Sequence, residues 1–134
     1  MYKLSKKSLR NLIGVHPMLS FIVTEAIAIT KQDFMVFEGK RTMERQRKLV
    51  AQGYSKTLNS YHLYGLAVDL VAYVDGKPTW EEQYYDEILK AMDTICETYN
   101  LQVDNGYRLW GWDQPHYQMT GYKNRYDIRQ IEKV

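Results

Sequence analysis

The chain of 134 residues contains a single cysteine, Cys96, and no long hydrophobic run. One cysteine excludes an internal disulfide and any zinc site built from several thiolates. Cys96 falls at helical spacing with Leu89, Met92 and Tyr99, which predicts a thiol in the core rather than a nucleophile. No apolar segment has the length of a membrane span or the form of a secretory signal. We therefore expect no membrane insertion, and a protein that is made in the cytoplasm and needs something else to release it if it works elsewhere.

Histidine is also scarce, with three residues in the chain, and the helical His-Glu-x-x-His zinc motif is absent. Any metal must therefore be held by ligands that separate segments bring together. Arginine-rich stripes and interleaved basic and aromatic residues are absent too, which argues against a nucleic-acid partner. The composition, 45% hydrophobic and 25% charged, is that of an ordinary globular protein. We expect one domain over residues 1–134, with a core over about 5–119 and a polar tail over 120–134.

Two of the histidines lie in short stretches that each contain an aspartate, Ser60-Tyr-His62-Leu-Tyr-Gly65-Leu-Ala67-Val-Asp69 and Asp113-Gln-Pro-His116. Two imidazoles and one carboxylate suit a catalytic Zn²⁺, which takes three protein ligands and keeps its fourth position open. We predict that His62, Asp69 and His116 bind one such ion, although ligands of this kind also accept Co²⁺, Mn²⁺ or Ni²⁺. Asp113 is then a candidate proton carrier in amide hydrolysis. The alternative for Asp113 is an ordinary turn aspartate before a proline.

The spacing of the first stretch demands a reversal of the chain. On one extended strand His62 and Asp69 would be roughly 23–25 Å apart, too far to share an ion. Gly65 stands between them, where a residue without a Cβ allows a turn. Residues 66–73 then read as a strand, with Asp69 flanked by small and apolar residues. A carboxylate buried there needs either a cation or an arginine partner.

Three further polar residues are candidates with open alternatives. Arg41 lies where a predicted strand gives way to a helix, and it suits a substrate carboxylate or a developing oxyanion. Its alternative is a salt bridge to Glu38 or Glu44. Ser60 and Gln46 are candidate substrate contacts, and the alternative for Ser60 is to cap a turn.

Other conspicuous residues receive structural interpretations. His16 has no acidic partner at ligand spacing and is predicted to be structural or exposed. Trp110 and Trp112 flank Asp113 and are predicted to form a wall of the cleft.

The pattern of the chain predicts an α+β fold. Helices are expected over 5–12, from Pro17 through the apolar stripe Leu19, Ile22, Val23, Ala26 and Ile27, over 43–52 after the N-cap Thr42, over 81–99, and over 126–132. Strands are expected over 34–37, 66–73, 101–104, 107–111 and 116–119, with a turn at Asp75-Gly76. This order predicts a small antiparallel sheet with helices packed on one face.

The two metal-site stretches resemble the zinc peptidases of the D-alanyl-D-alanine carboxypeptidase and L-alanyl-D-glutamate endopeptidase superfamily. Glu38-Gly-Lys-Arg41-Thr, with Glu44-Arg-Gln46 and Gly53, resembles the segment that supplies the substrate arginine of that superfamily. Ser8-Leu-Arg-Asn11-Leu-Ile-Gly14-Val-His-Pro17 resembles the start of bacteriophage endolysins of the L-alanyl-D-glutamate type.

By this resemblance His62, Asp69 and His116 bind zinc in a groove on the sheet, Asp113 is the catalytic acid/base, and Arg41 orients the substrate. Ser60 and Gln46 are lesser substrate contacts. The implied reaction cuts peptidoglycan stem peptides between L-alanine and D-glutamate and lyses the host wall from the periplasmic side, and we expect a monomer. One departure concerns Gln118, where these enzymes usually have glutamate, which leaves the support of the metal site in question.

Two alternatives stay open. A D-alanyl-D-alanine carboxypeptidase would share the same chemistry and release free D-alanine. A catalytically silent zinc-binding module would share the fold, but it would have no use for a proton carrier at Asp113.

Overall fold

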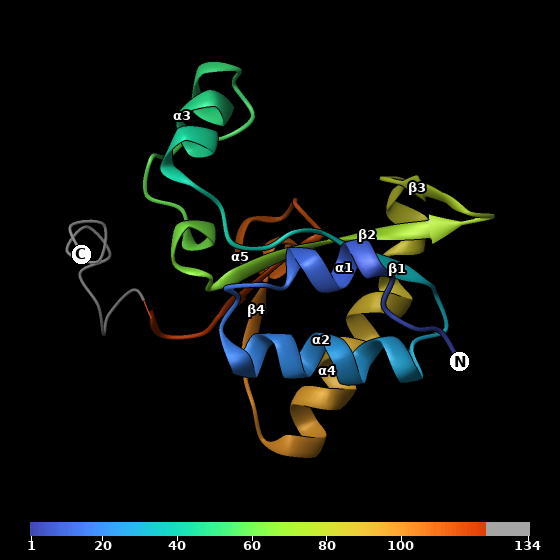
Figure 1. Ribbon diagram of the computed structural model, residues 1–134. Coiled ribbons are helices and arrows are strands. Elements are labelled where there is room, and N and C mark those ends of the chain that lie inside the picture. The colour runs from blue at the N-terminus through green and yellow to red at the C-terminus, as the bar shows by residue number, and fades with distance from the viewer. Residues whose placement is uncertain (123–134) are drawn as a thin grey trace.

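The computed structural model describes residues 1–122 as helices and strands around one antiparallel sheet. The predicted helix over 126–132 lies outside these residues. In chain order the elements are α1 (Lys6–Asn11), α2 (Pro17–Ile29), β1 (Phe34–Glu38), α3 (Met43–Ala51), η1 (Tyr61–Tyr64), β2 (Ala67–Val74), β3 (Lys77–Thr79), η2 (Glu82–Tyr84), α4 (Asp86–Tyr99), β4 (Val103–Asn105), α5 (Gly106–Trp110) and β5 (His116–Met119). Figure 1 shows their arrangement. Among the described residues no helix has both the length and the apolar character of a membrane span.

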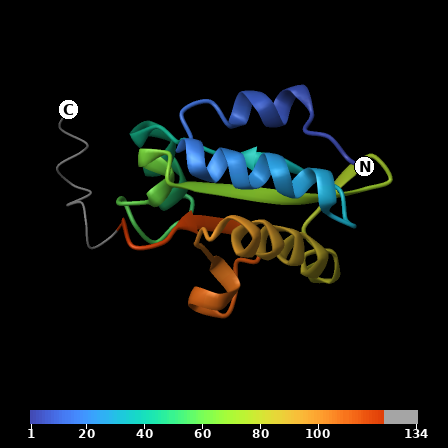
Figure 2. The ribbon, with the colours of Figure 1, turned by 90° about the horizontal axis from the view of Figure 1, so that it is seen from below.

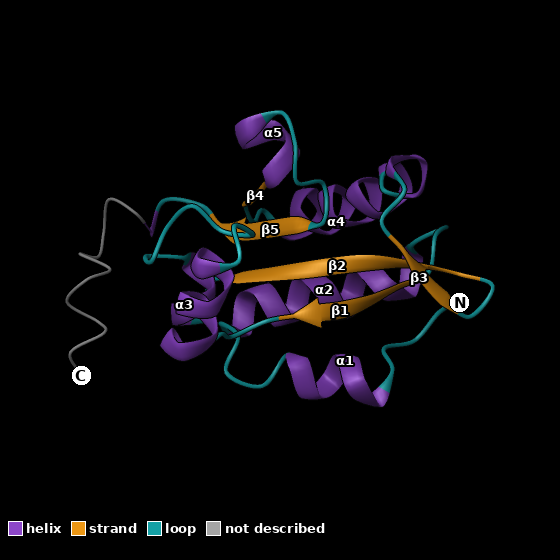
Figure 3. Ribbon diagram, turned by 90° about the horizontal axis from the view of Figure 1, so that it is seen from above, coloured by secondary structure: helices purple, strands orange, loops and turns teal. Residues whose placement is uncertain are grey.

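The sheet has the strand order β1-β2-β5-β4, and β3 pairs with β2 outside this path. The helices α2 and α4 contact each other and lie side by side over one face of the strands (Figure 2). The helix α1 lies along β1 at the edge of the sheet (Figure 3). These positions confirm the predicted α+β fold, and no helix within residues 1–122 covers the other face of the sheet.

The strand β2 shows why the two faces differ. Val68, Leu70 and Ala72 belong to the core cluster that packs beneath α2 and α4. Asp69 points to the opposite face, because side chains alternate along a strand. The predicted stripe of α2, five residues from Leu19 to Ile27, is buried in the same core. Burial of this stripe anchors α2 to the sheet and so fixes the open face as the one that carries polar groups.

The predicted starts of α1, α2 and α3 are confirmed by the residues at their first turns. Ser5 accepts a hydrogen bond from the backbone of Ser8 at the start of α1, and Thr42 accepts one from Arg45 at the start of α3. Pro17 occupies the first turn of α2, where its missing N–H has no intrahelical partner to lose. Asp75 and Gly76 both have positive φ, which closes a tight hairpin between β2 and β3.

Two predicted elements were wrong. Residues 106–110 form the helix α5 instead of a strand, because the Asn105 side chain accepts a hydrogen bond from the Tyr107 N–H and caps the helix. The predicted helix over 81–99 begins only at Asp86. The residues before it form β3 and η2, and the Tyr85 hydroxyl donates to the Thr79 carbonyl and accepts from the Ala72 N–H, which holds this segment against β2.

Candidate metal centre

Three chain segments bring His62, Asp69 and His116 together on the open face of the sheet. Asp69 in β2 pairs directly with His116 in β5, so their side chains are cross-strand neighbours on the same face. His62 lies in η1, and Gly65 ends η1 with a φ of 69°. A Cβ at Gly65 would lie 2.1 Å from the Gly14 carbonyl oxygen. The reversal predicted between His62 and Asp69 therefore depends on glycine for both its backbone conformation and its packing.

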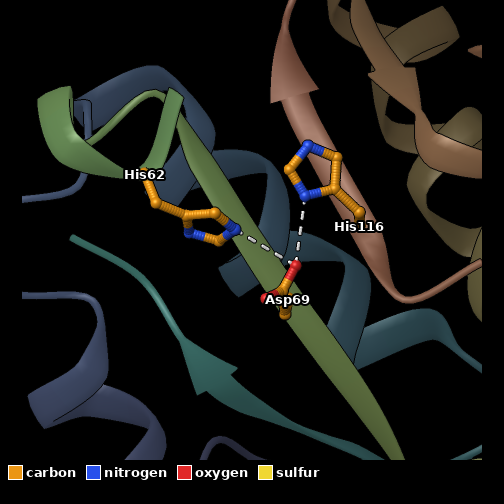
Figure 4. Close-up of side chains that lie close together, drawn as sticks. All are labelled: His62, Asp69 and His116. Carbon is orange, nitrogen blue, oxygen red and sulfur yellow. Dashed lines mark hydrogen bonds and ion pairs between the residues drawn. The ribbon is translucent and has the colours of Figure 1, made fainter. Parts of the chain in front are cut away.

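The potential ligand atoms converge on one oxygen of Asp69 (Figure 4). His62 Nε2 lies 3.2 Å and His116 Nδ1 lies 3.1 Å from Asp69 Oδ1. One potential ligand atom from each of the three residues lies within 4.8 Å of the other two. Ligand atoms bound tetrahedrally at about 2.0 Å from Zn²⁺ are themselves about 3.3 Å apart. The two separations from Asp69 therefore match those of a tetrahedral zinc site, and all three ligand atoms lie close enough together to bind one ion.

Each imidazole has a hydrogen-bond acceptor on the side away from Asp69, and these acceptors determine which ring nitrogen carries the proton. His62 Nδ1 lies 2.8 Å from the Gly39 carbonyl oxygen, and His116 Nε2 lies 2.9 Å from Gln118 Oε1. Both oxygens are acceptors, so each ring donates its N–H to them and turns an unprotonated nitrogen toward Asp69 in the neutral form. Two lone pairs and a carboxylate facing one point are stabilised by a cation at that point.

The titration of the cluster agrees with this need. Burial alone raises the pKa of Asp69, but His62 and His116 outweigh burial and hold this pKa well below its ordinary range. Burial lowers the pKa of His116, but the hydrogen bond and charge of Asp69 outweigh burial and raise it.

Asp113 lies beside this cluster in a strained turn. Its φ is 64°, and its carbonyl accepts a hydrogen bond from the His116 N–H at 3.2 Å. Burial first, and the negative charge of Asp69 second, raise the pKa of Asp113. A raised pKa suits a carboxyl group that exchanges protons near neutral pH.

Arg41 is almost completely buried and faces the cluster from the β1 side. Its Nε donates to Glu38 at 2.7 Å, its Nη1 donates to Gln46 at 2.8 Å, and its Nη2 lies 3.7 Å from Asp69 Oδ2. The salt bridge to Glu38 considered from the sequence is therefore present, and Glu44 pairs with Lys48 instead. Arg41 also supplies, at 3.7 Å, the arginine neighbour considered for Asp69.

Gln46 and Ser60 both have structural tasks. Gln46 is fully buried, and its amide group donates to Ser55 and to the Thr57 carbonyl while accepting from Arg41. Ser60 caps η1 by accepting a hydrogen bond from the His62 N–H at 3.2 Å. The turn-capping alternative for Ser60 is thus observed, and substrate contacts by Ser60 and Gln46 stay predictions.

His16 and Trp110 are placed in keeping with the sequence. His16 caps α2 by accepting from the Met18 N–H, and it lies 3.1 Å from the Tyr122 hydroxyl, so it is structural. The Trp110 ring lies 5.3 Å from the His116 ring, and Trp112 follows at 6.2 Å from Trp110. Trp110 therefore lies beside the cluster on the side of β5, with Trp112 next to it, and a cleft wall formed by the two indoles stays a prediction.

With this geometry established, comparison with known proteins identifies the family. A family model described as phage L-alanyl-D-glutamate peptidase matches residues 1–134. The chain belongs to this family.

The chain is also similar to two individual proteins. The chain is 30% identical over 84 residues to the L-alanyl-D-glutamate peptidase of Escherichia phage T5, and the match covers 60% of this chain and 61% of the phage T5 protein. The crystal structure of the Serratia marcescens L-Ala D-Glu endopeptidase ChiX is similar with a TM-score of 0.83 and 38% sequence identity, and the match covers 90% of this chain and 92% of that chain.

Three residues that support the centre were missed in the sequence. The carbonyl of Gly39 holds His62, and a Cβ at Gly39 would lie 2.1 Å from the Asn11 carbonyl oxygen. A Cβ at Gly106 would lie 2.2 Å from the Asp113 carbonyl oxygen. Asn105 Nδ2 donates to the carbonyls of Gln114 and His116 and so ties the turn to β5. The Asn105-Gly106 pair was a turn signal, whereas nothing local distinguished Gly39.

Proposed function

We propose that the protein is a zinc metallopeptidase that hydrolyses the amide bond between L-alanine and D-glutamate in peptidoglycan stem peptides. The observation that carries the proposal is the convergence of His62 Nε2, Asp69 Oδ1 and His116 Nδ1, with both imidazoles oriented by acceptors behind them. Membership of the phage L-alanyl-D-glutamate peptidase family supports the choice of bond. One Zn²⁺ bound by these three residues would supply a Lewis acid for the scissile carbonyl.

Asp113 moves the proton in this reaction. A water molecule adds its oxygen to the carbonyl carbon of L-alanine, and Asp113 accepts the proton that the water loses. The C–N bond then breaks, and Asp113 passes that proton to the amine of D-glutamate as it leaves. The buried setting that raises the pKa of Asp113 makes it more basic than an exposed aspartate and thus a better proton acceptor.

Arg41 binds the α-carboxylate of D-glutamate, next to the leaving amine. Its Nη2 end faces the cluster, while the bonds to Glu38 and Gln46 hold the guanidinium plane in place. A guanidinium fixed in advance loses little entropy when it binds a carboxylate. Gln46 and Ser60 serve this reaction by holding Arg41 and the η1 segment of His62, respectively.

The biological setting follows from the substrate. We propose a monomeric, single-domain endolysin that reaches peptidoglycan after another phage protein opens the inner membrane, and whose cleavage of the wall lyses the host. The substrate and the family support this setting.

Digestion of purified muropeptides tests the function. The protein, supplied with zinc, is incubated with disaccharide pentapeptide, whose stem ends in D-alanyl-D-alanine, and the products are identified by mass spectrometry with and without a chelator. We expect a new N-terminal D-glutamate, and no cleavage with chelator. Release of free D-alanine would instead establish a carboxypeptidase, and intact substrate under all conditions would indicate a silent binding module.

A further inference from the structure

The two sides of the metal centre differ in chemistry. On the β1 side stands the cation Arg41, at 3.7 Å from Asp69. On the β5 side stand two indoles, Trp110 at 5.3 Å from the His116 ring and Trp112 at 6.2 Å from Trp110. The cluster belongs to β2, β5 and η1, and Figure 3 shows β1 and α5, the helix that ends at Trp110, on opposite sides of β2.

Both indoles are exposed, and Trp110 lies directly beside the centre. Trp110 is 49% and Trp112 is 59% exposed, although tryptophan is a residue that proteins usually bury in large part. The helix α5 ends at Gly111, whose φ of 78° turns the chain so that Trp112 follows outside the helix. An apolar surface exposed at the rim of a catalytic centre is typical of a binding surface rather than of a core.

This asymmetry gives the substrate a direction, if the proposed function holds. The carboxylate that Arg41 binds belongs to D-glutamate, on the leaving-group side of the scissile bond. The acyl side, L-alanine and the group that L-alanine is attached to, must then extend the opposite way, toward α5. In peptidoglycan L-alanine is joined through a lactyl group to N-acetylmuramic acid.

The reach of the substrate matches the position of the indoles. One residue spans about 3.5 Å and the lactyl group a similar distance, so the sugar ring begins roughly 7 Å from the scissile carbonyl. The Trp110 ring centre lies 5.3 Å from that of His116, and the Trp112 ring centre lies 6.2 Å from that of Trp110, so the indole pair lies at a comparable distance from the centre. The C–H face of a pyranose ring is flat and apolar and packs on an indole, while the methyl groups of alanine and lactate are too small to cover two indoles.

We infer that Trp110 and Trp112 form a subsite for the N-acetylmuramyl sugar of the substrate, so that the enzyme prefers stem peptides still attached to glycan. This inference rests on the proposed function and adds the part of the substrate that the metal centre does not contact. Trp112 is the specificity-determining residue of the pair, because Trp110 also packs on His116.

The test compares kcat/KM on two substrates, the disaccharide tetrapeptide and the free tetrapeptide of the same sequence. Wild-type protein is expected to prefer the disaccharide substrate, and Trp112→Ala to lower this preference about tenfold, the loss of roughly one good aromatic contact. Trp112→Phe keeps a flat ring and should retain most of the preference. Trp80→Ala is the matched control, because Trp80 is 53% exposed and packs on Phe37 at the β1 side.

Zinc content and melting temperature are measured for each variant, and the ratio of the two kcat/KM values removes any general loss of activity. Equal kcat/KM of the wild type on both substrates would overturn the sugar subsite and leave the peptidase function intact. So would an equal loss on both substrates in Trp112→Ala. A wild-type protein that cuts neither substrate would remove the proposed function, and the subsite with it.

Discussion

The two histidines of the centre are held in place by different kinds of group. His62 donates to the backbone carbonyl of Gly39 at 2.8 Å, whereas the ring of His116 is oriented by the side chain of Gln118 at 2.9 Å. A backbone carbonyl is present whatever the residue, so the support of His62 changes only if the chain moves. The support of His116 is a single amide group that one substitution removes. The centre therefore combines one support fixed by the fold with one that sequence change can tune.

The surroundings of the two supports differ in the same way. Gly39 is packed so closely against α1 that a Cβ would lie 2.1 Å from the Asn11 carbonyl oxygen. Gln118 is half-buried in β5, opposite Ala67 of β2. A substitution at Gly39 should thus lower the stability of the fold, whereas a substitution at Gln118 should lower the affinity for the metal ion.

The largest effect is expected from removing the group that both histidines face. Asp69→Asn loses the carboxylate charge that balances a bound cation, so zinc should be lost on dialysis and peptidase activity abolished. Metal content by mass spectrometry and muropeptide cleavage measure this. A variant that retains a full equivalent of zinc would contradict the assignment of Asp69 as a ligand.

Asp113→Ala should separate chemistry from metal binding. We expect the variant to keep its zinc but to lose about 10²–10⁴-fold in turnover, the usual contribution of a general acid/base. Metal content and kcat are measured on the same preparation. Normal turnover would show that another group carries the proton.

Gln118→Leu should lower the affinity for zinc, because it removes the hydrogen-bond partner of His116 and of no other ligand. Loss of a hydrogen bond behind a metal ligand typically costs 10–100-fold in metal affinity or activity. Gln118→Glu keeps an acceptor for His116 Nε2 and should retain zinc, which makes it the matched control. Zinc affinity by competition with a chelator decides the matter, and equal affinities in all three proteins would mean that Gln118 does not support His116.

Gly39→Ala should lower the stability of the fold rather than the affinity for zinc. Its Cβ would overlap the Asn11 carbonyl oxygen, so β1 and α1 must move apart at a cost of about 1–3 kcal/mol of unfolding free energy. Urea denaturation of the metal-free protein measures this cost. An unchanged unfolding free energy would show that the contact between Gly39 and α1 relaxes freely.

The smallest effect concerns pH and Glu38. Burial alone raises the pKa of Glu38, but Arg41 together with Arg45 and His62 outweighs burial and lowers this pKa in the folded state. The folded protein therefore gains stability at pH values above the unfolded pKa of about 4.5, and loses that gain as the pH falls through the lower folded value. Glu38→Gln should be less stable than wild type at neutral pH, with the difference shrinking below pH about 4. A constant difference down to pH about 2 would contradict the role of its charge.

The sequence predicted most of the centre because its signals are local. His62, Gly65 and Asp69 lie within one stretch, and the need for a chain reversal followed from spacing alone. The apolar stripe from Leu19 to Ile27 was also predicted correctly, because its spacing repeats over several turns of α2.

The parts that the sequence did not predict depend on short elements and distant contacts. The helix α5 has five residues, too few for a helical period to show, and its exposed aromatic residues resemble a strand. The partners of Gly39 and Gly106 are brought close by tertiary packing, so one sequence could not show that a side chain is excluded there. The pair of Glu38 and Arg41 was visible only as one of two alternatives, because charged residues in one segment can pair in several ways, and the bond from Arg41 to Gln46 was not predicted.

The central claim is that one divalent cation is held between His62, Asp69 and His116. X-ray absorption spectroscopy of the zinc-loaded protein, together with its metal stoichiometry, tests this claim most directly. The account predicts one zinc per chain with two imidazole nitrogens among light-atom ligands, and loss of this signal in Asp69→Asn. A protein that binds no zinc, or whose zinc spectrum is unchanged by that substitution, would contradict it.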